Sequence, residues 1–237
     1  MNQKGDLVIN GFGASGGGQF HLVTINGFGT VNNDVDCTEF ECNGFGTVTG
    51  NVKSDKTKVN GKAKFKGNIE GKVLSIEGTA KIDQNLYVEN LNVSGTAAVG
   101  GKVKCEEIKI KGHLKVGEDC EAEIFKAESQ FVIGGLLNAD QIEINLYGES
   151  KAKEIGGQTI TVKHKGSLFG QLLKPLFQTQ LETELIEGDK IVLENTTAKV
   201  VRGNQITIGP NCRIDVVEYT GEAFIDKKAL VGDSRKI

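Results

Sequence analysis

Histidine and cysteine are the side chains of this chain best suited to metal binding, acid–base catalysis or nucleophilic attack. The 237-residue sequence has three histidines and five cysteines, spread along its length. No carboxylate or cysteine stands around His21, His113 or His164 at a spacing typical of a metal site or a catalytic triad. We therefore expect no metal site, and we expect His113 to be a solvated surface residue.

The cysteines are odd in number and form no CxxC pair: Cys37, Cys42, Cys105, Cys120 and Cys212. The N-terminal sequence MNQKGDLVING lacks the apolar region and cleavage site of a signal peptide, and the chain has no apolar run of about 18 residues. These features predict reduced, structural thiols in a soluble cytoplasmic protein. A net charge of -3, with scattered lysines and arginines, argues against nucleic-acid binding.

Motifs of known catalytic and cofactor sites are missing from the sequence, among them GxxxxGK[ST], HExxH, GxSxG and GGxGxD. GGGQ at Gly16–Gln19 precedes no helical pattern, which favours a turn over a phosphate-binding loop. One stretch keeps an enzyme open as the alternative: ITIGPNCRI (Ile206–Ile214) resembles the hexapeptide repeat of left-handed β-helix acyltransferases. That hexad occurs essentially once and no histidine lies near it, so we expect a protein that is not an enzyme and binds no cofactor.

A 17-residue repeat organises the chain up to about Gly112 and continues less strictly beyond it. It is marked by one glycine column: Gly27, Gly44, Gly61, Gly78, Gly95 and Gly112. Positions 4, 8 and 15 after this glycine are hydrophobic in row after row, although the chain as a whole is only 38% hydrophobic. Each of them has an inward companion two residues away, so every row carries three inward pairs.

Inward pairs spaced by two residues predict short strands with one buried face. Three such strands in every row predict an all-β, triangular β-helix (β-solenoid) whose successive turns pair about 4.8 Å apart. We expect a main β-helix of about nine turns at residues 1–166, an insertion at 167–184, and further turns with a C-terminal tail at 185–237. The pairs Ile206/Ile208 and Cys212/Ile214 indicate two turns after the insertion.

The insertion contains an apolar pattern that a short helix could present on one face, before or around Pro175. Leu172, Leu176 and Phe177 belong to that pattern. Two roles stay open for it: it covers a flank or end of the β-helix, or it docks a partner or a membrane surface.

The tetrapeptide NGFG occurs at Asn10–Gly13, Asn26–Gly29 and Asn43–Gly46. Its phenylalanine falls at an outward position, so Phe12, Phe28 and Phe45 are predicted to form an exposed aromatic ladder. Two roles stay open here as well: contacts between subunits, or packing of the rings on one another or under the insertion. The candidate interaction residues are these three phenylalanines together with Leu172, Leu176 and Phe177.

The repeated rows, best over about Asn43–Ala127, resemble the bactofilins, which are bacterial polymer-forming cytoskeletal proteins. The example GTAKIDQNLYVENLNVSGTAAVGGKVKCEEIKIKG carries the likeness, and EGDKIVLENTTAKVVRGNQITIGPNCRIDVVEY is similar to the tail of longer, Firmicute-type members. The resemblance implies a right-handed β-helix that stacks end to end into nucleotide-independent filaments. It also implies a scaffold that positions other proteins in cell-shape, motility or envelope processes. The partner would be the protein itself, and a peripheral contact with the inner face of the cell membrane stays open.

Overall fold

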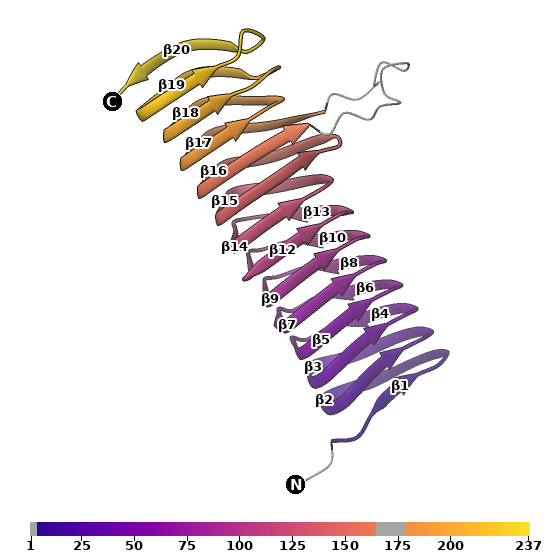
Figure 1. Ribbon diagram of the computed structural model, residues 1–237. Coiled ribbons are helices and arrows are strands. Elements are labelled where there is room, and N and C mark those ends of the chain that lie inside the picture. The colour runs from indigo at the N-terminus through magenta and orange to yellow at the C-terminus, as the bar shows by residue number, and fades with distance from the viewer. Residues whose placement is uncertain (1–3, 165–178) are drawn as a thin grey trace, which may run out of the picture. The chain divides into compact units, whose positions relative to one another are not determined.

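The computed structural model describes residues 4–164 and 179–237, and it divides the chain into unit 1, Met1–Glu118, and unit 2, Asp119–Ile237 (Figure 1). In the described residues the regular structure is β-strand, and no helix is long and apolar enough to cross a bilayer. Both units are β-solenoids, with about 13 turns in total. The prediction of an all-β solenoid is confirmed.

Unit 1 contains thirteen strands, which follow one another in chain order. They are β1 (Leu7–Ile9), β2 (Phe12–Ile25), β3 (Phe28–Cys42), β4 (Phe45–Val48), β5 (Val52–Val59), β6 (Lys62–Phe65), β7 (Ile69–Ile76), β8 (Thr79–Ile82), β9 (Leu86–Val93), β10 (Thr96–Val99), β11 (Val103–Lys104), β12 (Glu107–Ile110) and β13 (His113–Val116).

Unit 2 contains seven strands, most of which are longer than those of unit 1. They are β14 (Cys120–Ala127), β15 (Gln130–Leu146), β16 (Glu149–His164), β17 (Gln180–Leu193), β18 (Thr196–Ile208), β19 (Arg213–Ile225) and β20 (Leu230–Lys236).

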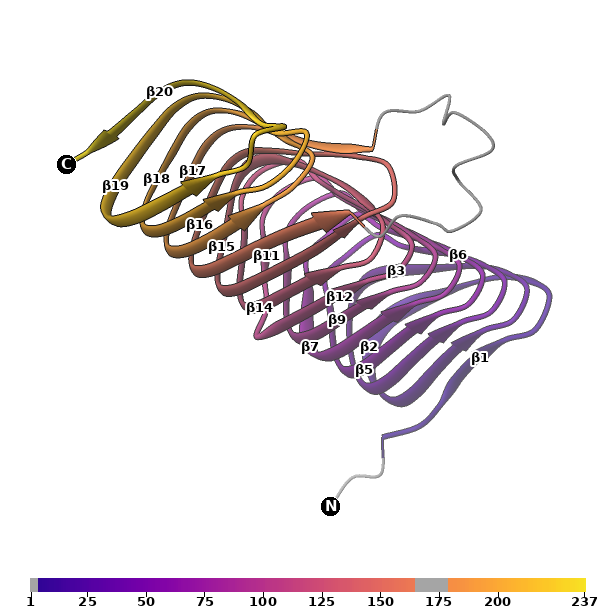
Figure 2. The same ribbon diagram turned by 45° about the horizontal axis from the view of Figure 1, so that its top comes forward.

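Strands pair in parallel with the strand one coil away, and within each unit successive coils follow nearly the same path (Figure 2). In unit 1 the pairing confirms the 17-residue period: Phe28 lies beside Phe45, and Phe45 lies beside Lys62. Between the first two coils the interval is 16 residues, with Phe12 beside Phe28.

Two of the three strands predicted in each row run together as one bent strand in most coils. Along β5 the side chains of Val52, Ser54, Thr57 and Val59 are buried. Two consecutive exposed residues, Asp55 and Lys56, interrupt the alternation and mark the corner between the two inward pairs. The two segments separate only around β11 and β12 among the described coils.

The corner before this bent strand carries a ladder of side-chain caps. In four successive coils a carboxylate or amide oxygen accepts a hydrogen bond from the backbone N–H one coil further on, at 2.7 to 3.1 Å; the acceptors are Asp34, Asn51, Asn68 and Asn85. Asp119 accepts the N–H of Leu136 in the same way in unit 2, at 3.1 Å. These residues were predicted as turn formers, and the ladder satisfies corner amides that no strand pairing reaches.

The sequence prediction underestimated the number of C-terminal coils. It expected two turns after the insertion, whereas β17, β18 and β19 each supply a coil and β20 begins another. The interval shortens to 15 residues between Leu181 and Thr196, so rows of 17 residues do not align here. Gln180 already lies in β17, before the expected boundary at residue 185. The expected helical pattern in the insertion falls largely on residues 165–178, which lie outside the described residues.

Candidate interaction surfaces

An exposed aromatic ladder stands on the first three coils of unit 1, as the sequence predicted. The rings of Phe12 and Phe28 stack with their centroids 4.8 Å apart at an interplanar angle of 3°, and Phe28 and Phe45 stack at 4.8 Å and 2°. The exposed fractions of the three residues are 88%, 50% and 53% in chain order. Stacking at the coil spacing therefore leaves about half of each inner ring, and nearly all of Phe12, in contact with water.

An asparagine ladder runs beside the aromatic ladder. Asn26 Nδ2 donates to Asn10 Oδ1 at 2.7 Å, Asn43 Nδ2 to Asn26 Oδ1 at 2.9 Å, and Asn60 Nδ2 to Asn43 Oδ1 at 2.6 Å. Parallel pairing at one fixed interval brings identical side chains into contact, so a repeated Asn gives a hydrogen-bonded column and a repeated Phe gives a stack.

The N-terminal edge of unit 1 is open over most of its length. β1 pairs only with Val23–Ile25 of β2, and among the described residues no strand lies on the N-terminal side of Phe12–Phe20. Nearer the corner, Gly5 O accepts the N–H of His21 at 2.9 Å, and Asp6 Oδ1 accepts that of Leu22 at 3.2 Å. The cap therefore covers one face of the first coil and leaves the rest uncovered.

The direction of the free groups follows from the repeat. The N–H groups of Phe28, Phe45 and Lys62 each donate to the preceding coil, at 2.7 to 2.8 Å. In the first coil the equivalent N–H belongs to Phe12, and that of Ala14, two residues on, points the same way because directions alternate along a strand. Both N–H groups are directed at the open edge.

The C-terminal edge of unit 2 is open too. β20 pairs with β19 from Leu230 to Lys236, and among the described residues it has no strand on its other side. Exposed apolar side chains gather on this last coil: Phe224, Ile225, Leu230 and Ile237.

A carboxylate ties the last three coils together. Glu218 on β19 is only 8% exposed, and it accepts hydrogen bonds from Arg202 Nε of β18 at 2.8 Å and from Arg235 Nη2 of β20 at 2.5 Å. The hydrogen bond from Arg235, followed by that from Arg202, lowers the pKa of Glu218 below its ordinary value.

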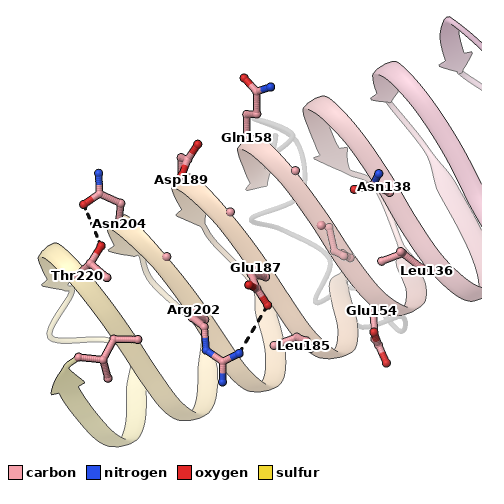
Figure 3. A pocket seen from close by; sticks show the side chains of 16 residues that line it. Leu136, Asn138, Glu154, Gln158, Leu185, Glu187, Asp189, Arg202, Asn204 and Thr220 are labelled. Carbon is pink, nitrogen blue, oxygen red and sulfur yellow. Dashed lines mark hydrogen bonds and ion pairs between the residues drawn. The ribbon is translucent and has the colours of Figure 1, made fainter.

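A groove of about 600 Å³ runs across successive coils of unit 2 (Figure 3). Its wall–floor–wall pattern repeats as Glu187-Gly188-Asp189 and Arg202-Gly203-Asn204. Arg202 pairs with Glu187 at 3.6 Å, and Thr220 donates to Asn204 at 3.1 Å, as the dashed lines in Figure 3 show. Amides and carboxylates beside a glycine floor suit hydrogen bonding to a ligand.

The sequence prediction missed this groove. Its signal is the glycine at the small inward position ten residues into the repeat, where Gly157, Gly188 and Gly203 follow the smaller residues of earlier rows. That column became visible only once the shortened C-terminal intervals were known.

The other predicted residues fall as follows. All five cysteines are free and buried, and burial raises the pKa of Cys105 to about 12 and those of Cys42 and Cys212 to about 11. Ile206, Ile208, Cys212 and Ile214 of the hexad-like stretch are core residues. Within residues 4–164 and 179–237, no group of three His, Cys, Asp or Glu side chains is arranged to hold a metal ion. Leu172, Leu176 and Phe177 lie outside the described residues.

Fold and surfaces together define a parallel β-solenoid protein with two open edges and an exposed aromatic ladder. The chain is 62% identical over 233 residues to the "uncharacterized protein YhbE" of Bacillus subtilis (strain 168), a match covering 98% of both chains. It is also 39% identical over 104 residues to the "uncharacterized protein YhbF" of the same organism, covering 44% of this chain and 42% of YhbF. No family model and no solved structure matches. The chain belongs to the family of YhbE.

Proposed function

We propose that this protein is a non-catalytic cytoskeletal scaffold of the bactofilin kind, which stacks its solenoids end to end into filaments without a nucleotide. The observation that carries the proposal is the pair of open strand edges, one on the first coil of unit 1 and one on the last coil of unit 2. In this proposal the filament positions other proteins in cell-shape, motility or envelope processes.

Open edges favour assembly because their backbone N–H and C=O groups lack protein partners. A strand added at such an edge gains a row of backbone hydrogen bonds and covers the apolar end of the core. Natural proteins usually protect edges with charge, proline or a covering segment, yet Phe12–Phe20 contains no charged residue and no proline. The N-terminal edge is therefore a template for the end of another subunit.

The C-terminal edge offers a different surface for the same purpose. Phe224, Leu230 and Ile237 expose apolar area on the last coil, and stacking would cover part of it. Contacts that join one end to another leave free ends on the product, so assembly continues into a filament and does not stop at a closed ring.

The test is negative-stain electron microscopy of the purified protein, without nucleotide and across a range of salt, for the wild type and for Ala14→Pro. Proline removes an N–H directed at the open edge and no hydrogen bond within the coil, so the variant should fold with a nearly unchanged melting temperature and form no filaments. Ala14→Thr is the matched control, since threonine is the residue at the same position in the next two coils, and it should polymerise.

Uniform small particles of wild-type protein under every condition would contradict unaided polymerisation. The acyltransferase alternative would then be tested by trimer formation and by binding of coenzyme A. Filaments of the Ala14→Pro variant as abundant as those of the wild type would contradict the role of the N-terminal edge.

In this proposal the filament works in the cytoplasm, and any contact with the inner face of the cell membrane is peripheral. Co-sedimentation of preformed filaments with vesicles of anionic and of neutral lipid tests that contact directly. Binding to neither would confine the scaffold to protein partners.

A further inference from the structure

The outward face of the first three coils of unit 1 carries no charge. We call this the uncharged face: the outward side chains of residues 10–16, 26–32 and 43–49. These stretches contain no Asp, Glu, Lys, Arg or His, in a chain whose residues are 25% charged. The next coil ends the pattern abruptly, with Lys62, Lys64 and Lys66. A flat, exposed and uncharged sheet face is a surface that proteins normally avoid unless something packs on it.

The relief of this face is a ridge between two furrows. Phe12, Phe28 and Phe45 form the ridge, with rings stacked at 4.8 Å. On one side stand the glycines of NGFG, which have no side chain, and on the other stand Ala14, Thr30 and Thr47. A ridge beside a furrow is complementary in shape to a second copy of itself, because the ridge of each copy can enter the furrow of the other.

The polar groups on this face are already satisfied. The amides of Asn10, Asn26 and Asn43 hydrogen-bond along their own column at 2.7 to 2.9 Å. A protein surface packed on the face therefore removes apolar ring area from water without stripping these amide-to-amide hydrogen bonds. The same amides would be costlier to place in a lipid layer, where their remaining groups find no partners.

The lysines on the fourth coil select one orientation. If two copies packed in parallel, Lys62 and Lys64 of one would face the same lysines of the other, and like charges would repel. If they packed antiparallel about an axis at the second coil, the first coil of one copy would face the third coil of the other. Each lysine row would then lie beyond the edge of its partner.

We propose that the uncharged face is a self-pairing surface, on which a second copy of this chain packs its own uncharged face antiparallel, with a two-fold axis near Phe28. This inference rests on the proposed function, because the face is too small to hold two single chains together. Three strands about 4.8 Å apart and about 20 Å long cover on the order of 300 Å² per copy, against about 800 Å² in a standard interface. Filaments repeat the contact at every subunit, so the pairing joins two filaments side by side through many weak contacts.

The first test compares Phe28→Lys with the control Thr79→Lys, which adds the same charge at the equivalent outward position two coils beyond the face. Electron microscopy should show paired or bundled filaments for the wild type and for Thr79→Lys, and single filaments for Phe28→Lys. Low-speed sedimentation, which collects bundles, should recover at least fivefold less of Phe28→Lys. Wild-type filaments that are single and equal in width to those of Phe28→Lys would overturn the pairing and leave end-to-end stacking standing.

The second test does not require filaments. Ala14→Cys and Thr47→Cys place thiols on the first and third coils, and the native cysteines are buried and compete little. At high protein concentration, mild oxidation should cross-link an equimolar mixture of the two single variants, whereas Ala14→Cys alone should stay monomeric. Cross-linking of Ala14→Cys to itself would overturn the antiparallel arrangement.

The two proposals fail separately. No filaments, but the expected cross-links, would contradict end-to-end stacking and support the self-pairing face. Filaments without cross-links or bundles would do the reverse. Vesicle binding that Phe28→Lys abolishes, in the absence of cross-links, would assign the face to a lipid surface and overturn self-pairing.

Discussion

Glycine at the first corner of each coil lets successive coils of unit 1 approach to strand-pairing distance. A Cβ atom built on Gly44, Gly61 or Gly78 would lie 2.0 to 2.1 Å from the carbonyl oxygen of the glycine one coil earlier, whereas real Cβ contacts stay above 3.0 Å. These three glycines do not have positive φ, so backbone freedom does not explain them. The column is required by close approach between coils.

The corresponding prediction concerns one atom. Gly78→Ala forces the coil to shift against backbone and should lower the free energy of unfolding by about 2–4 kcal/mol. Gly16→Ala is the control, because nothing lies within 4 Å of its added Cβ, and it should change stability by at most about 0.5 kcal/mol. Urea unfolding followed by circular dichroism measures both. Equal midpoints for the two variants would contradict the close-approach argument.

At the scale of strands and coils, the sequence was sufficient wherever the repeat was strict. The inward columns and the aromatic ladder follow from a period of 17, because a fixed interval brings equivalent side chains into register. The same method lost the C-terminal coils, where the interval falls to 15 and then returns to 17. The groove of unit 2 was missed for that reason, since its walls come together only when the true intervals are known.

The Glu218 clamp was invisible to the sequence for a related reason. Arg202, Glu218 and Arg235 stand 16 and 17 residues apart, and nothing in the chain singles them out until β18, β19 and β20 are placed side by side. Once they are placed, one carboxylate holds two guanidinium groups on successive coils, and β20 depends on it.

A prediction for β20 follows from that contact. The pKa of Glu218 is lowered from its ordinary 4.5 in the folded chain, so its stabilising contribution is present above about pH 4.5 and is lost as the pH falls through the folded value. Amide hydrogen exchange in Leu230–Lys236 should therefore speed up, relative to a chain without this clamp, when the wild type is acidified. Glu218→Gln should show fast exchange of β20 already at pH 7.

The control for this prediction is Asp233→Asn. Asp233 meets Arg235 at 3.7 Å, but both side chains are more than half exposed, so this pair should contribute little. If Asp233→Asn accelerates exchange in β20 as much as Glu218→Gln does, the clamp is not specific to Glu218.

At the scale of the whole molecule, the two open edges make every chain a subunit that can receive a neighbour at either end. A chain with one blocked edge can still join a filament through its other edge, but growth stops there. Ala14→Pro should therefore act as a terminator: added in small proportion to wild-type protein, it should shorten the filaments, and the mean length should fall as its share rises. Ala14→Thr at the same proportions should leave the length distribution unchanged, because its edge N–H remains. Electron microscopy of the mixtures measures the lengths directly. If Ala14→Pro leaves the lengths unchanged while failing to polymerise alone, it never enters the filament, and the edge it blocks is needed to join as well as to extend. If it polymerises alone at normal length, the N-terminal edge is not the contact, and assembly must run through the last coil of unit 2 on both sides of each junction.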